Sequence, residues 1–231
     1  MQKPKPSSTA FRSLTLQAVM LAITLFASIG MAQADLIPAI TFTSYDDADG
    51  NATDNTTRGY TFNVTAPVYV AGLSIFDADA DGLFEAHDVG LWTLGGQLLA
   101  SVSIDSGMAD PLDSSGHFRY KLLDSVLTLA VDTGYRVGAY FANGSGDKQA
   151  STMDGLSTAA GISFVGGAYI NDTLSNPISA LTFPSNNLTG NKIPGGSLLL
   201  TDSPVPEPAT LPLMAAGVLF GLAGRRVTKR Q

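Results

Sequence analysis

The sequence predicts an all-β protein whose body is an antiparallel, jelly-roll-like β-sandwich. An N-terminal signal helix and a short C-terminal transmembrane helix are expected to flank this body. Short runs of β-branched and aromatic residues recur along the body, separated by clusters of Gly, Asn, Asp and Pro. No part of the body shows a sustained helical period, which disfavours a parallel βαβ architecture. Many short strands at regular spacing favour a sandwich.

Residues 1–34 are typical of a secretory signal peptide, which implies passage through the Sec translocon and removal by signal peptidase. The apolar stretch 13–30 follows three basic residues, Lys3, Lys5 and Arg12. Ala32 and Ala34 fit the small-x-small cleavage pattern, so the mature chain is expected to begin at Asp35. The alternative is an uncleaved membrane helix.

The body, residues 35–204, is long enough for one sizeable core and does not require two domains. The two-residue link Gly95-Gly96 predicts a hairpin. The polar stretches 46–59 and 143–155 are expected to be surface loops. The segments expected to form strands are 39–45, 59–65, 68–76, 89–94, 97–104, 117–123, 135–141, 161–170 and 196–200.

The charge of the body differs from that of the whole chain, which has a formal net charge of −7. Between residues 35 and 204 there are six Lys or Arg and 19 Asp or Glu, so the body carries −13. Such an acidic domain repels nucleic acid, and we expect no nucleic-acid partner. The chain has no cysteine, so its stability must come from a core or from bound ions.

The stretch 76–88, FDADADGLFEAHD, resembles the opening of a calcium loop. Alternating aspartates followed by Gly82 supply hard oxygen ligands around a tight turn, as Ca²⁺ requires. The twelfth position is Asp rather than Glu and the preceding segment is expected to be a strand, so a true EF-hand is disfavoured. An acidic surface turn is the alternative. The candidate calcium ligands are Asp77, Asp79, Asp81, Leu83, Glu85 and Asp88.

No catalytic signature stands out, and we expect the protein not to be an enzyme. The two histidines, His87 and His117, are too few for a His-rich metal site, and each is expected to be structural. Trp92 is expected in the core. The abundant carboxylates leave open an exported hydrolase that acts on polysaccharide through a carboxylate pair.

The chain ends in a short apolar run followed by basic residues. Residues 210–224 carry no charge and would form a helix of about 22 Å, shorter than the ~30 Å hydrocarbon core. The basic residues Arg225, Arg226, Lys229 and Arg230 would stay on the cytoplasmic side and leave the body outside. The segment therefore favours a transient stay in the inner membrane over permanent anchoring.

Val205-Pro206-Glu207-Pro208, the apolar run and the arginine pair Arg225-Arg226 together resemble the PEP-CTERM sorting signal of Gram-negative bacteria. The tail is also known as an ice-binding-protein C-terminal domain, a name that by itself implies no ice binding. The resemblance implies that an exosortase recognises the Pro-Glu-Pro motif and removes the tail by a cut near this motif. The body would then reach the cell surface or the exopolysaccharide matrix.

The body also resembles a β-rich domain of unknown function found in PEP-CTERM proteins, through residues 70–104 and 118–141. This resemblance implies a fold and no activity. We therefore expect an exported, exosortase-processed protein with a structural or adhesive role, which binds extracellular polysaccharide or is stabilised by calcium. A hydrolase and, less favoured, an ice-binding protein are the alternatives.

Overall fold

The computed structural model describes residues 35–48, 54–190 and 195–202. The predicted signal helix, the cleavage-site residues Ala32 and Ala34, the sorting motif and the predicted transmembrane helix lie outside these residues. Within them, no helix is long and apolar enough to cross a membrane. The body forms one compact unit, residues 34–205.

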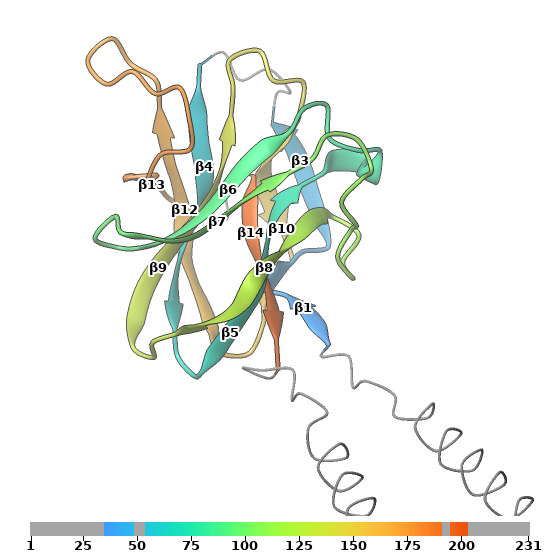
Figure 1. The fold of residues 1–231 in the computed structure, drawn as a ribbon, viewed down its shortest axis with the longest axis vertical. Coiled ribbons are helices and arrows are strands. Elements are labelled where there is room, and N and C mark those ends of the chain that lie inside the picture. Colours follow the sequence, from blue (N-terminus) through green and yellow to red (C-terminus); the bar gives the residue numbers. More distant parts are fainter. Residues whose placement is uncertain (1–34, 49–53, 191–194, 203–231) are drawn as a thin grey trace, which may run out of the picture. The chain divides into compact units, whose positions relative to one another are not determined.

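Two antiparallel sheets build the body, as the sequence predicts (Figure 1). In the six-stranded sheet the order is β13-β12-β4-β9-β6-β7, and in the four-stranded sheet it is β1-β14-β5-β8. The larger sheet contains β4 (Thr56–Val64), β6 (His87–Thr93), β7 (Leu98–Ile104), β9 (Thr133–Phe141), β12 (Ile162–Asn171) and β13 (Asn186–Leu188). The smaller contains β1 (Leu36–Pro38), β5 (Val68–Phe76), β8 (Phe118–Leu129) and β14 (Gly196–Thr201).

Besides the two main sheets, the described residues contain two short two-stranded ribbons and one helical turn. The ribbons are β2 (Ile40–Thr41) with β11 (Ser157–Thr158), and β3 (Ser44–Ala48) with β10 (Gln149–Asp154). The turn is a 3₁₀ helix, η1 (Ala78–Ala80), and the described residues contain no α-helix. The predicted hairpin at Gly95-Gly96 is present between β6 and β7, and the positive φ of 85° at Gly96 explains the glycine.

The core lies between the two sheets and is rich in aromatic side chains. Phe62, Phe76, Phe118 and Phe141 are almost fully buried, so that burial of their rings supplies much of the stability that a cysteine-free chain needs. The hydroxyl groups of Tyr60 on β4 and Ser197 on β14 lie 3.2 Å apart and link the two layers. Trp92 is buried as expected, but it packs against Phe183 and is not part of this cluster.

Glycines allow close backbone approach both within the larger sheet and between the two layers. Gly59 on β4 stands opposite Gly138 on β9, and a Cβ added to Gly59 would lie 1.7 Å from the carbonyl oxygen of Val137. A Cβ on Gly196 of β14 would lie 2.6 Å from the carbonyl carbon of Gly138. A larger residue in place of Gly59 or Gly196 would overlap backbone atoms and force strands apart.

The two predicted surface loops contain strands, so the sequence-based expectation was wrong for parts of 46–59 and 143–155. β3 and the start of β4 lie in the first stretch, and β10 lies in the second. These strands are polar, so their composition resembles that of loops. The side chains of Ala150 and Met153 on β10 are nevertheless part of the core. Two buried apolar side chains therefore outweigh the loop-like composition of the stretch.

Candidate functional site

The acidic stretch predicted as a calcium loop connects β5 to β6 at one end of the sandwich. It forms one wall of a hollow of about 210 Å³, and the segment that leads into β10 forms the other. The charged and aromatic residues that line the hollow are Asp77, Asp79, Asp81, Phe84, Asp147 and Lys148. The hollow therefore combines several carboxylates with one ammonium group and one exposed aromatic ring.

Asp77 is buried and forms an ion pair with Arg119 of β8. The Arg119 Nε donates to Asp77 Oδ2 at 2.6 Å, and both side chains are at most 4 % exposed. Burial raises the pKa of Asp77, and the guanidinium opposes that rise. Arg119 also donates to the carbonyl oxygens of Asp110 at 2.8 Å and Ala80 at 3.3 Å. One arginine therefore ties together the acidic loop, the 105–112 segment and the core strand β8.

Asp147 holds the other end of the acidic loop. Its carboxylate accepts hydrogen bonds from the backbone amides of Phe84 at 2.7 Å and Glu85 at 3.1 Å, and it contacts His87 Nε2 at 2.7 Å. Burial would raise the pKa of Asp147, but the hydrogen bonds from His87 and the two amides outweigh it and lower the pKa. Asp147 is therefore an ionised residue that fixes the loop.

His87 is a structural residue, as the sequence analysis expects. It is 1 % exposed, and its Nδ1 lies 2.8 Å from the carbonyl oxygen of Tyr140. Both ring nitrogens face acceptor oxygens, a carbonyl on one side and a carboxylate on the other. His87 therefore ties β6 to the backbone of β9 and to the Asp147 carboxylate.

The structure does not gather the six candidate calcium ligands into one site. Asp77 is bound to Arg119, and the carbonyl oxygen of Leu83 accepts a hydrogen bond from the Gly107 amide at 2.7 Å. Asp88 is exposed on β6, and Glu85 is partly buried. In the described part of the chain, no three Asp, Glu, His or Cys side chains lie close enough together to hold a metal ion.

Asp79 and Asp81 are the exposed candidate ligands that line the hollow. Both are exposed at the rim of the hollow, where Asp79 Oδ2 lies 3.7 Å from Lys148 Nζ. The backbone here is strained, because Asp79 and Ala80 have positive φ values of 66° and 57°. Gly82, at φ 108°, closes the turn against Gly107, which agrees with the role predicted for this glycine.

Sequence reasoning missed Arg119 and Asp147, the two residues that organise this loop. Arg119 lies 42 residues after its partner Asp77, and Asp147 lies 60 residues after its partner His87. Only the folded sheets bring each pair together. One signal in the sequence could have indicated the role of Arg119. The acidic body contains only six Lys or Arg, so a buried basic residue has many possible acidic partners. His117, the second histidine, stacks on Phe42 with ring centroids 4.7 Å apart.

Replacing Asp147 with Asn should change the pH dependence of stability. The lowered pKa means that the Asp147 carboxylate stabilises the fold above its ordinary value of 3.8, and that this contribution is lost as the pH falls through the lowered value. Urea unfolding from pH 7 to pH 2 should show a lower stability for Asp147→Asn near neutrality and a shallower loss in acid. Parallel curves for the two proteins would contradict this role.

Comparison with known proteins identifies the end of the chain. Residues 204–227 match the family model of the PEP-CTERM protein-sorting motif. The match covers Val205 to Pro208 and the Arg225-Arg226 pair, which the sequence analysis selected. No curated protein matches the chain. The chain thus carries a PEP-CTERM sorting motif, which indicates an exported, membrane-transiting protein targeted to an exosortase.

Proposed function

We propose that the processed body is a structural or adhesive component of the cell surface or the exopolysaccharide matrix and is not an enzyme. The observation that carries this proposal is the PEP-CTERM motif at 204–227, which follows an exported, strongly acidic β-sandwich. A sorting tail that is removed after export leaves a body whose work is done outside the cell. A cysteine-free core of two packed sheets suits that role, because it needs no redox partner.

The hollow at the acidic loop supports a non-enzymatic role. A polysaccharide hydrolase needs two carboxyl groups that face each other across the bond to be broken and are free to act on it. The two buried carboxylates that line the hollow are Asp77, which is bound by Arg119, and Asp147, which is bound by His87. Their hydrogen bonds serve the loop backbone, which favours a structural use.

The same proposal includes stabilisation by calcium, with fewer protein ligands than the six candidates of the sequence analysis. Asp77 and the Leu83 carbonyl are engaged within the protein, so the exposed carboxylates of Asp79 and Asp81 are the groups proposed to bind Ca²⁺. The remaining ligands would be water or backbone oxygens, as Ca²⁺ accepts. Such a site would be weak, in the millimolar range typical of extracellular modules.

Processing by exosortase can be read from the mass of the native protein. The form recovered from the cell surface or medium should begin at Asp35 and lack most or all of residues 205–231. In cells without the exosortase, or with Glu207 replaced by Ala, the full tail should remain and the protein should stay in the membrane fraction. A surface form that retains Val205 to Gln231 would contradict the proposal.

Calcium binding can be tested by thermal unfolding of the exported protein. Millimolar CaCl₂ should raise the melting temperature above that in NaCl of equal ionic strength, because Ca²⁺ binds the folded loop. The double variant Asp79→Asn/Asp81→Asn should lose the increase, whereas Asp154→Asn, an exposed control on β10, should keep it. An equal melting temperature in both salts would contradict the proposed binding of calcium.

A further inference from the structure

Phe84 is a large apolar side chain that the fold leaves exposed. It belongs to the loop between β5 and β6, lines the hollow of about 210 Å³, and is 79 % exposed. A Cβ added to Gly146 would lie 2.8 Å from Cγ of the Phe84 ring and 3.0 and 3.1 Å from its two Cδ atoms. These nearly equal distances place Gly146 over one face of the ring, so the opposite face is open to a ligand.

The backbone that carries this ring is fixed. The Phe84 amide donates to Asp147 Oδ1 at 2.7 Å, and Asp147 is buried and bound by His87. Leu83, the residue before Phe84, is buried and shares two backbone hydrogen bonds with Gly107. A ring on a fixed backbone loses little conformational entropy when a ligand binds, which favours a role in binding.

Carboxylates surround the exposed ring. Asp79 and Asp81 are exposed and line the same hollow, and Lys148 is the one basic residue among its described lining residues. The body as a whole carries −13. A positive charge is attracted both by carboxylates and by the face of an aromatic ring, whereas an acidic ligand is repelled. The hollow therefore favours a cationic ligand that also has an apolar surface.

The lining favours a sugar over a protein as that ligand. Protein interfaces place several apolar side chains around an aromatic anchor and exclude water from it. Phe84 is the only large apolar side chain among the described residues that line the hollow, and the others are small or charged. A sugar ring matches this lining, because it has an apolar face and a polar edge.

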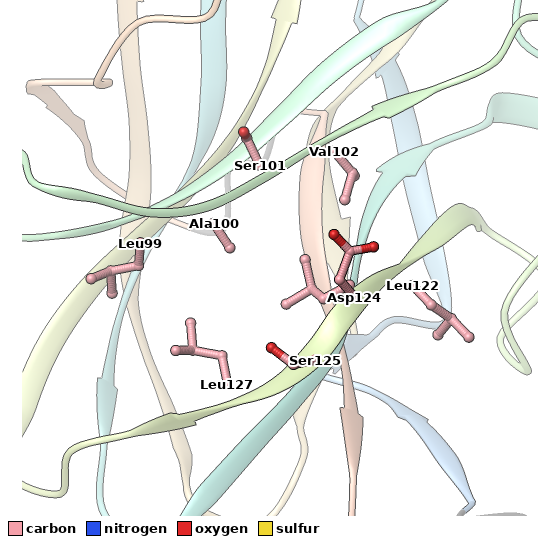
Figure 2. A pocket seen from close by; sticks show the side chains of 9 residues that line it. Leu99, Ala100, Ser101, Val102, Leu122, Asp124, Ser125 and Leu127 are labelled. Carbon is pink, nitrogen blue, oxygen red and sulfur yellow. The ribbon is translucent and has the colours of Figure 1, made fainter.

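A second hollow, between β7 and β8, does not combine these features (Figure 2). It measures about 270 Å³, and Leu99 and Ala100 of β7 and Leu127 of β8 point into it. Its described lining residues include no aromatic residue and one charged residue, Asp124. This mostly aliphatic lining does not indicate the chemistry of a ligand, in contrast to the hollow beside Phe84.

We propose that the hollow at Phe84 binds a sugar residue of a polysaccharide that carries free amino groups. The apolar face of the sugar would lie on the open face of Phe84, and its ammonium group would donate to the carboxylates of Asp79 and Asp81. The proposal rests on the proposed role in the exopolysaccharide matrix and specifies the chemistry of the polysaccharide.

The size of the hollow fits one sugar residue. Its volume of about 210 Å³ is below the range of about 300–1,000 Å³ that is typical of pockets for drug-sized ligands. A single site is therefore weak. A polysaccharide repeats the same residue along its length, so a layer of many copies of the protein holds one chain more tightly than a single copy does.

Isothermal titration calorimetry of the exported protein tests this proposal. The probe is a chitosan oligosaccharide, at low salt and at a mildly acidic pH that keeps its amino groups charged, with EGTA to keep Ca²⁺ from the carboxylates. We expect binding that weakens as NaCl is added, and binding of the N-acetylated oligosaccharide of the same length that is weaker by about tenfold or more. Oligogalacturonate, which is acidic, should not bind.

Two variants locate the site. Phe84→Ala and the double variant Asp79→Asn/Asp81→Asn should each raise the dissociation constant about fivefold or more, because they remove the ring and the carboxylates that hold the ammonium group. These side chains are exposed, so both variants should fold as the wild type does. Met108→Ala, an exposed apolar side chain outside the hollow, and Asp154→Asn, an exposed carboxylate on β10, are the matched controls and should leave the constant unchanged.

Three results would overturn the proposal: no binding of the chitosan oligosaccharide, equal binding of its N-acetylated form, or an unchanged dissociation constant in Phe84→Ala. Oligolysine that binds as tightly as the chitosan oligosaccharide would overturn the choice of a saccharide. The mass of the surface form, which tests processing by the exosortase, does not depend on any of these results. Failure of saccharide binding is therefore distinguishable from failure of the proposed function.

Discussion

The buried ion pair between Asp77 and Arg119 is the interaction on which the functional end of the molecule depends. Asp77 directly follows the core strand β5 and begins the acidic loop, and Arg119 is the second residue of β8, the neighbouring strand. The remaining guanidinium hydrogens bind the Ala80 carbonyl oxygen of this loop and the Asp110 carbonyl oxygen of the 105–112 segment. A charge buried without its partner is costly, so the fold at this end requires both residues.

A second buried pair, His87 and Asp147, holds the other end of this loop. Two buried carboxylates of an acidic protein are thereby bound from within, Asp77 by an arginine and Asp147 by a histidine. Asp79 and Asp81, in contrast, remain exposed at the rim of the hollow. The loop is accordingly a rigid part of the sandwich that presents acidic groups to the exterior.

Much of the fold and the sorting motif could be predicted from the sequence. The partners of the buried charged residues could not, and the reason is physical. The alternating runs predict the sheets, and Val205 to Pro208 with the arginine pair predicts the sorting motif. The ligand pattern around Gly82 predicts the tight turn, because alternating aspartates and glycine suit a turn with or without a metal. Arg119 could not be assigned to Asp77, since only the pairing of β5 with β8 brings them together.

A double-mutant cycle on this ion pair tests the account most directly. Chemical unfolding of Asp77→Asn, Arg119→Met and the double variant gives the coupling free energy between the two side chains. We expect each single change to cost about 3–5 kcal/mol, because it leaves the partner's charge buried alone, and the double variant to lose clearly less than their sum, because it leaves no buried charge. Additive losses would contradict the claim that the protein's own cations organise the acidic loop.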